Sequence, residues 1–266
     1  MERDLHATRR GDGPPVILLH SGGMSSRQWK RLGDELATTH LVIAPDFLGS
    51  GDNPPWPAGA DFHIGMDVDA IAAIVAGLDQ PVHLVGHSYG GLVALSVARR
   101  DPSRVASVAA YDPVAFGVLA EPRDAVGLDD LSQAAKNPVF TDEAVGGTDA
   151  WFEVFVDYWN GPGAWRALPT PARESFLRVG RKVFLEVRSL MDDRTPGSAY
   201  AGITAPALLI TGSASPPAAQ RVVARLAESL PAARAMTVEG AGHMGPITHA
   251  RVVVDAIASH VRAASG

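Results

Sequence analysis

The fold is decided by the stretch VHLVGHSYGG, residues 82–91. Its first four residues are apolar and predict a buried strand, and the residues after Ser88 predict a helix. Between strand and helix, the pattern Gly86-x-Ser88-x-Gly90 places a serine on a tight turn, whose strained backbone lifts the hydroxyl clear of the sheet. The helix that begins behind Ser88 directs amide N–H groups and partial positive charge toward this hydroxyl. The stretch therefore predicts that Ser88 is a nucleophile.

Apolar runs and helical patterns alternate along most of the chain. Strands are predicted over residues 16–20, 41–44, 82–85, 105–111, 207–210 and 233–238. Helices are predicted over residues 25–37, 67–78, 89–99, 217–230 and 246–262. Continuous apolar strands suit a sheet covered on both faces, and strands that alternate with helices pair in parallel. We therefore expect an α/β fold with a doubly wound, mostly parallel sheet.

One long segment, residues 114–200, interrupts this alternation because it contains no clear core strand. We interpret it as a helical lid inserted into an α/β core that comprises residues 1–113 and 201–266. Aromatic side chains gather within residues 151–159, where they can form the core of the lid, the wall of a substrate pocket, or both. The pocket residues predicted from this cluster are Trp151, Phe155 and Trp159.

A glycine-flanked histidine near the end of the sequence is the candidate general base. In proteins that carry such a serine turn, the acid and then the base follow the nucleophile along the chain. His243 lies in the run GAGHMG, between the last predicted strand and the final helix. It can therefore accept the Ser88 proton and return it to a leaving group. His249 is the local alternative, but it falls inside the final helical pattern.

Two backbone N–H groups are expected to hold the negative oxygen of a tetrahedral intermediate. One belongs to Tyr89, the residue after the nucleophile. The other belongs to the glycine-containing loop after the first predicted strand, where we choose Gly22. Ser21 precedes Gly22, so its hydroxyl can assist there, and we place it in the substrate pocket.

These motifs together resemble the α/β-hydrolase superfamily over nearly the whole chain. The motifs are His20-Ser-Gly-Gly23, Pro45-Asp46 with Gly49-Ser-Gly51, GHSYGG from Gly86, and GAGHMGP from Gly240. The resemblance implies an eight-stranded, mostly parallel sheet, a lid after the sixth strand, an esterase-like or lactonase-like activity, and no metal or organic cofactor. Most relatives carry His-Gly where this chain has His-Ser, a departure that bears on the second oxyanion donor. A serine nucleophile argues against the dehalogenase and epoxide hydrolase branches, which use aspartate.

The acid of the triad departs from the usual pattern of this superfamily. Its usual place is the loop after the predicted strand 207–210, but that loop reads TGSASPP and holds no carboxylate. Asp112 follows a strand predicted to neighbour the nucleophile strand, and some relatives share this arrangement. From there a carboxylate can reach the far nitrogen of His243, fix its tautomer and stabilise the imidazolium. Asp192 and Asp193 are the next candidates.

Composition and charge exclude several classes of function. The 266 residues carry a formal net charge of −6 and no cysteine, so a basic nucleic-acid surface, disulfides and thiolate chemistry are not expected. Residues 1–10 lack the apolar core of a signal peptide, and the longest apolar stretch, residues 70–78, is too short to span a bilayer. We expect a soluble, cytoplasmic protein that takes a small-molecule substrate, with no metal, nucleic acid or membrane as partner.

The sequence predicts a serine hydrolase that cleaves carboxylic esters of small to medium size through an acyl-enzyme on Ser88. Lactone hydrolysis uses the same groups. The alternatives are a carbon–carbon bond hydrolase or a cofactor-free perhydrolase on the same triad, and a ligand receptor built on a hydrolase scaffold.

Overall fold

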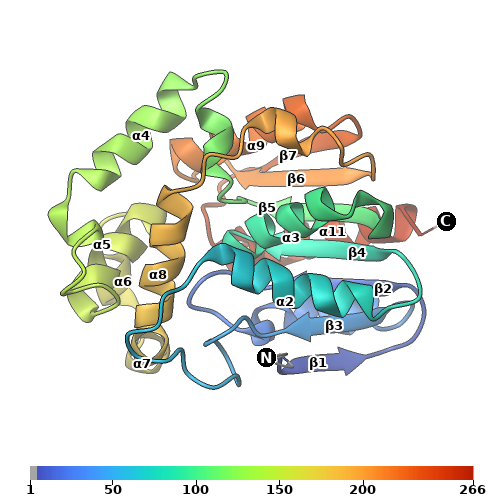
Figure 1. Ribbon diagram of the computed structural model, residues 1–266, viewed down its shortest axis with the longest axis horizontal. Coiled ribbons are helices and arrows are strands. Elements are labelled where there is room, and N and C mark those ends of the chain that lie inside the picture. The colour runs from blue at the N-terminus through green and yellow to red at the C-terminus, as the bar shows by residue number, and fades with distance from the viewer. Residues whose placement is uncertain (1–4, 266) are drawn as a thin grey trace.

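The computed structural model describes residues 5–265 (Figure 1). Residues 1–4, which begin the segment expected to lack a signal peptide, and residue 266 lie outside the described residues. One sheet contains β1 (Ala7–Arg10), β2 (Pro15–Leu19), β3 (Leu41–Pro45), β4 (Val82–His87), β5 (Val105–Tyr111), β6 (Ala207–Gly212) and β7 (Ala233–Val238). The strand order is β1-β3-β2-β4-β5-β6-β7, and all neighbours are parallel except β1 and β3. The predicted α/β class and mostly parallel sheet are confirmed.

The sheet differs from the prediction at one edge and in its number of strands. It has seven strands within residues 5–265, whereas the resemblance implies eight. Only Leu5 and His6 of the described chain precede β1, and two residues are too few for a further strand. The hydrophobic pattern gives no signal for β1 itself, because the sequence Ala-Thr-Arg-Arg is an exposed edge strand without an apolar run.

Helices cover both faces of the sheet. The core helices are α1 (Lys30–Leu36), α2 (Ile64–Ala76), α3 (Tyr89–Arg100), α9 (Pro217–Ser229), α10 (Gly245–Thr248) and α11 (Ala250–Ala263), with short 3-10 helices η1 (Ser26–Trp29) and η2 (Pro102–Arg104). Along β2, Ile17 and Leu19 pack in the layer of α2, α3 and α9, whereas Val16 and Leu18 pack in the layer of α1 and α11. This split follows from the two-residue period of a strand. None of the helices in residues 5–265 is long and apolar enough to cross a membrane.

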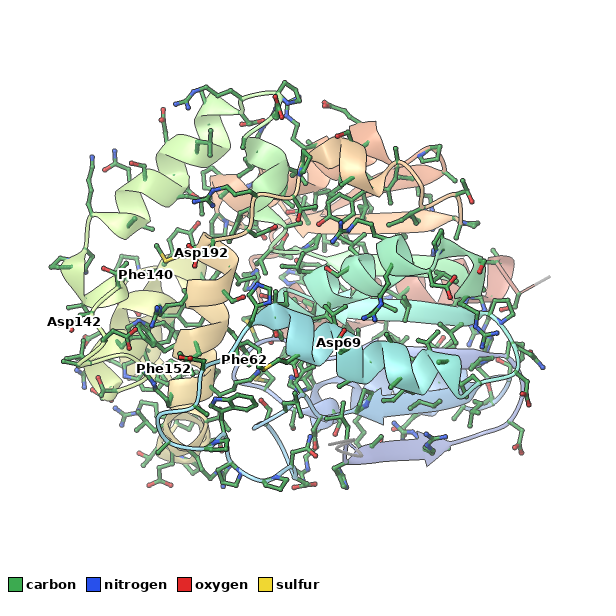
Figure 2. All side chains as sticks on the ribbon, viewed as in Figure 1. Phe62, Asp69, Phe140, Asp142, Phe152 and Asp192 are labelled. Carbon is green, nitrogen blue, oxygen red and sulfur yellow. The ribbon has the colours of Figure 1, made fainter. Side chains whose placement is uncertain are left out.

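The segment between β5 and β6 carries the remaining helices, and we call residues 114–200 the helical insert. It contains η3 (Phe116–Leu119), α4 (Ala125–Ala135), η4 (Pro138–Phe140), α5 (Asp149–Asn160), α6 (Ala164–Ala167), α7 (Thr170–Arg178), α8 (Gly180–Met191) and η5 (Gly197–Tyr200). Figure 1 shows α4 to α8 grouped beyond one end of the strands. The insert has an apolar core of its own around Trp151, Phe152 and Phe184, and Figure 2 labels Phe152 there.

Candidate active site

Ser88 stands on the turn between β4 and α3. Its backbone angles are φ 55° and ψ −118°, a region that residues with a side chain rarely adopt. The Ser88 N–H donates to the carbonyl oxygen of Tyr111 at 2.9 Å and holds the turn against β5. A Cβ atom on Gly86 would lie 2.2 Å from the Gly90 oxygen, and one on Gly90 would lie 2.4 Å from the Leu19 oxygen. The turn therefore has no room for side chains at these two glycines.

Three side chains from separate loops form one hydrogen-bonded chain. Ser88 Oγ lies 3.0 Å from His243 Nε2, and His243 Nδ1 lies 3.1 Å from Asp112 Oδ2. Because a carboxylate only accepts, Nδ1 carries the ring proton and Nε2 can accept the proton of the serine hydroxyl. The three residues are 8%, 4% and 0% exposed, so bulk water is largely kept from the chain. The structure brings together the residues that the sequence selects as nucleophile, base and acid.

The Asp112 carboxylate is held by two hydroxyl groups that sequence reasoning did not select. Thr211 Oγ1 donates to Oδ1 and Ser215 Oγ donates to Oδ2, both at 2.6 Å. Both hydroxyls come from the end of β6 and the loop after it, where the sequence offers no carboxylate. The sequence TGSAS does contain a signal for these two residues. It lacks the usual acid but holds hydroxyl groups, which can donate hydrogen bonds to an acid on the neighbouring strand. They satisfy the carboxylate while leaving Oδ2 in reach of His243.

A second chain of polar contacts joins two loops of the site. His87 Nε2 donates to the His243 carbonyl oxygen at 2.8 Å, and Gln28 Nε2 donates to His87 Nδ1 at 2.9 Å. Gln28 Oε1 accepts from the Ser21 N–H at 2.9 Å and from the Ser21 hydroxyl at 3.2 Å. Burial lowers the pKa of His87 well below its usual range, so the neutral ring keeps one donor and one acceptor. The contacts fix the base loop relative to the loop that precedes Gly22.

Two residues with unpaired backbone amides in the described part of the chain line a cavity of about 800 Å³, which Ser88 also lines. Tyr89 and Gly22 both line this cavity, together with Ser21 and His243. Within residues 5–265 neither the Tyr89 N–H nor the Gly22 N–H donates a hydrogen bond. Tyr89 is the first residue of α3, where a helix leaves its N–H groups without internal partners. Both amides can therefore bind an oxygen of a ligand.

The aromatic residues predicted to line the pocket divide into two groups. Phe155 and Trp159 line the cavity, as does Ser21. Trp151 does not: it is 0% exposed, its indole N–H donates to the Phe140 oxygen, and its ring stacks on Phe155 at 4.8 Å. The prediction for Trp151 is therefore wrong. Residues four apart share one helix face, so Trp151, Phe155 and Trp159 lie on the same face of α5. Trp151 is one turn further from the cavity and packs in the core of the insert.

Trp159 also makes a direct contact with the triad. Its ring stacks on the His243 imidazole with 3.8 Å between ring centroids and 21° between planes. Trp159 belongs to α5 of the insert, whereas His243 belongs to the loop before α10. The insert therefore contacts the base itself, besides forming the wall of the cavity.

Known proteins resemble this chain over most of its sequence. The sequence model of the "Alpha/beta hydrolase family" matches residues 16–256. The chain belongs to the alpha/beta hydrolase family. "Lipase LipV" of Mycobacterium tuberculosis is 39% identical to this chain over 113 residues, 41% of the chain and 42% of that protein. A "Pimeloyl-[acyl-carrier protein] methyl ester esterase" of Aeromonas salmonicida is 36% identical over 100 residues, 38% of each protein.

The matches to these curated relatives span about two fifths of their length. Solved structures extend the similarity over nearly the whole chain. The enol-lactonase from Burkholderia xenovorans has a TM-score of 0.69 at 20% identity, and the match covers 97% of this chain and 96% of that protein. At this identity the likeness shows the fold alone.

The alternative base and acids that the sequence offered lie outside the triad. His249 stands between α10 and α11, where its Nδ1 lies 3.0 Å from the Thr248 hydroxyl. Asp192 is exposed at the end of α8, where Figure 2 labels it. Asp193 Oδ1 accepts from the Thr195 N–H at 2.9 Å. None of the three makes a hydrogen bond to Ser88 or His243 in the part of the chain that the structure describes.

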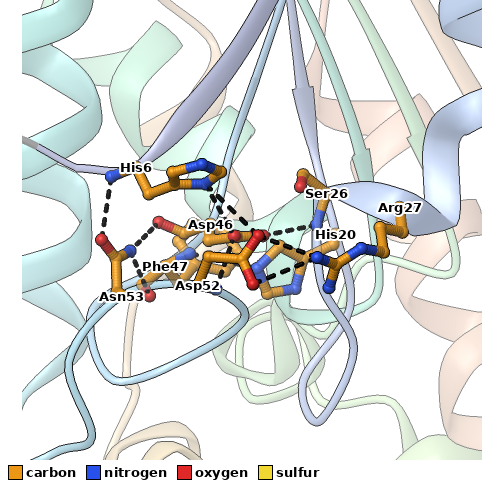
Figure 3. Close-up of polar contacts among 8 residues, drawn as sticks. All are labelled: His6, His20, Ser26, Arg27, Asp46, Phe47, Asp52 and Asn53. Carbon is orange, nitrogen blue, oxygen red and sulfur yellow. Dashed lines mark hydrogen bonds and ion pairs between the residues drawn. The ribbon is translucent and has the colours of Figure 1, made fainter.

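One group of side chains in the described residues has the spacing of metal ligands, namely His6, Asp46 and Asp52. Figure 3 shows that the Asp46 oxygens are already occupied. Oδ1 accepts from the Ser26 N–H at 2.6 Å, and Oδ2 accepts from the Asp52 N–H at 2.9 Å and lies 3.2 Å from His6 Nδ1. Asp52 in turn binds Arg27 at 2.8 Å. These contacts hold the loop after β3 and account for the cluster without a metal.

Proposed function

We propose that this protein is a serine hydrolase that cleaves a carboxylic ester or lactone of small to medium size through an acyl-enzyme. The observation that carries the proposal is the chain from the Ser88 hydroxyl through the His243 imidazole to the Asp112 carboxylate, with both links near 3 Å. Such a chain makes a neutral serine nucleophilic, because the imidazole takes its proton as the oxygen attacks.

The proposed reaction has two halves. Ser88 Oγ attacks the carbonyl carbon while His243 Nε2 takes the hydroxyl proton, and the Tyr89 and Gly22 amides stabilise the negative oxygen that forms. Collapse of this intermediate breaks the bond to the alcohol oxygen, which receives the proton from His243. Water then attacks the acyl-enzyme by the same route, and the acid leaves with Ser88 restored. Asp112 orients the His243 ring and stabilises the imidazolium.

The shape and lining of the cavity support an apolar substrate portion. The cavity has about 800 Å³, and most of its lining residues are apolar, among them Phe155, Trp159 and Leu190. We further propose that the helical insert acts as a lid, with residues 1–113 and 201–266 as the core. The relatives named lipase and methyl ester esterase support ester-bond chemistry.

The proposal is tested with a fluorophosphonate probe and a panel of substrates. Stoichiometric labelling that disappears in Ser88→Ala, together with turnover of esters or lactones, is the expected result. Labelling with cleavage of a vinylogous diketone, or with peracid formation, and no ester turnover would assign the triad to the carbon–carbon hydrolase or perhydrolase chemistry. A native protein that takes no label would instead favour a ligand receptor.

A further inference from the structure

One buried carboxyl group faces the apolar cavity without belonging to the triad. Glu186 of α8 lines the cavity beside Ser88 and Gly22 and is 2% exposed. Burying a polar group in apolar surroundings is costly unless it has hydrogen-bond partners. If both carboxyl oxygens have partners within the protein, Glu186 has a structural role only. An oxygen without a partner is available to bind a ligand.

Only one of the two Glu186 oxygens has a partner in the fold. Lys182, one turn earlier in α8, donates to Oε1 at 2.7 Å and to Asp67 Oδ2 at 2.9 Å, and its Nζ lies 3.9 Å from the centre of the Phe62 ring. Figure 2 labels Phe62 between α8 and α2. The Tyr89 hydroxyl donates to the same Asp67 oxygen at 2.7 Å. Within residues 5–265, Glu186 Oε2 accepts no hydrogen bond.

The free oxygen lies next to the expected oxyanion site. A Cβ atom on Gly22 would meet Glu186 Oε2 at 2.9 Å, so the carboxyl group packs directly against this glycine. Gly22 is one of the two residues whose amide is proposed to hold the oxygen of the reacting carbonyl. A ligand group that reaches Oε2 must therefore lie within a few bonds of that carbonyl.

We propose that Glu186 is a specificity-determining residue that hydrogen-bonds a hydroxyl group close to the scissile carbonyl, so that the preferred substrates are hydroxy-substituted esters or lactones. The inference rests on the proposed ester hydrolysis and narrows its substrate class. A substrate hydroxyl satisfies the free oxygen, whereas the unsubstituted analogue buries it without a partner. Sites built around such a polar group reject analogues that lack the matching one.

Charge favours a neutral hydroxyl over an ammonium group. The Lys182 cation lies beside the carboxyl group and opposes a second positive charge there. Burial raises the pKa of Glu186, with Lys182 opposing the rise and Asp67 adding to it. A hydroxyl both donates and accepts, so it can pair with either protonation state of the carboxyl group. An ammonium group can only donate, so it cannot accept a hydrogen bond from Oε2 when Glu186 is protonated.

The test measures binding and does not depend on turnover. Isothermal titration of Ser88→Ala compares ethyl hexanoate with ethyl 2-hydroxyhexanoate and ethyl 3-hydroxyhexanoate. We expect one of the hydroxy esters to bind about tenfold more tightly than ethyl hexanoate or better. Adding Glu186→Leu should bring that ratio close to one. The control Ser132→Ala removes a hydroxyl elsewhere on the cavity wall and should leave the ratio unchanged.

Glu186→Leu leaves the buried Lys182 cation without one of its partners and can prevent folding. A second variant avoids this problem. Lys182→Met/Glu186→Leu removes both partners and carries the same expectation. Equal affinity for all three esters, a preference that survives Glu186→Leu, or tighter binding of ethyl 3-aminohexanoate would each overturn the proposal. Because the ratio is measured without Ser88, a failure of ester hydrolysis would show separately, as absent turnover in the native protein.

Discussion

Ser88 and Asp112 are the two non-glycine residues with a positive φ in the part of the chain that the structure describes, at 55° and 42°. Backbone in this region costs on the order of 1–3 kcal/mol and persists only where surrounding contacts enforce it. Ser88 is held by its N–H bond to the Tyr111 oxygen, and Asp112 by its N–H bond of 2.8 Å to the Ile210 oxygen. Strain at two members of one proposed triad indicates that β5 and β6 position these side chains at the expense of local stability.

At the scale of single residues, Asp112→Asn tests the acid. The amide keeps the shape of the side chain but removes the charge that stabilises the imidazolium. We expect the fold to persist and turnover of an ester to fall by roughly 10⁴-fold, as in other triads. Steady-state kinetics with circular dichroism as the fold check measure this. Turnover close to that of the native protein would move the acid elsewhere.

Ser215→Ala tests the support of that acid. The variant removes one of the two 2.6 Å hydrogen bonds to the Asp112 carboxylate, and hydrogen bonds to charged groups contribute about 1.5–3 kcal/mol. We expect kcat/KM to fall roughly tenfold, with Thr211 still in place. Ser213→Ala is the matched control, since the Ser213 hydroxyl accepts from Gly240 and not from the triad. An equal loss in both variants would show a general effect of the loop.

At the scale of secondary-structure elements, the helical insert depends on a close backbone contact at the start of α8. A Cβ atom on Gly180 would lie 2.0 Å from the Gly147 oxygen. We expect Gly180→Ala to lower the free energy of unfolding by a few kcal/mol, because backbone rather than a flexible side chain must move. Gly202→Ala is the control, since nothing lies within 4 Å of the added atom. Chemical denaturation measures both, and equal midpoints would contradict the expectation.

The stack of Trp159 of α5 on His243 makes the insert part of the proposed machinery. An aromatic face holds the ring in place and attracts it when it becomes a cation, which is worth about 0.5–2 kcal/mol. We expect Trp159→Leu to slow both ester turnover and labelling by a fluorophosphonate about tenfold. Trp56→Leu removes an indole that packs on Phe62 instead and should leave the labelling rate unchanged. If Trp159→Leu is labelled as fast as the native protein, Trp159 only lines the cavity and does not assist His243.

At the scale of the whole molecule, we expect the buried histidines to lower the stability of the fold in acid. Burial is the first cause that lowers the pKa of His20, His40, His83, His87 and His260. For His83 the pKa falls from 6.5 to about 4. The unfolded chain therefore binds more protons than the folded one below pH 6.5, and stability decreases as the pH falls.

Thermal melting at pH 7.5 and pH 5 checks this expectation. The His83 shift alone corresponds to a loss of about 2 kcal/mol at pH 5. We expect His83→Gln to reduce the difference between the two melting temperatures, whereas His249→Gln, at a partly exposed position, should not. A melting temperature that rises toward pH 5 would refute the role of the buried histidines.

The sequence alone predicts the parts of the protein that depend on local pattern. Apolar runs such as residues 82–85 predict the buried strands. The glycines around Ser88 predict the turn, because a tight turn has no room for side chains at these positions. The exposed edge strand β1 escapes this reading, since its polar sequence gives no apolar signal. Trp151 shows the same limit, because an aromatic residue packs equally well in the core of an insert and on a cavity wall.

By itself, the sequence determined the serine turn from a few neighbouring residues, and the doubly wound sheet and the choice of histidine from the order of strands, helices and loops along the chain. Only the tertiary structure decided the contacts between distant segments. It placed Thr211 and Ser215 on the Asp112 carboxylate, Trp159 against His243 and Glu186 against Gly22. The physical reason is that hydrogen bonds and ring contacts depend on distances of a few ångströms, and the packing of the insert on the sheet sets these distances.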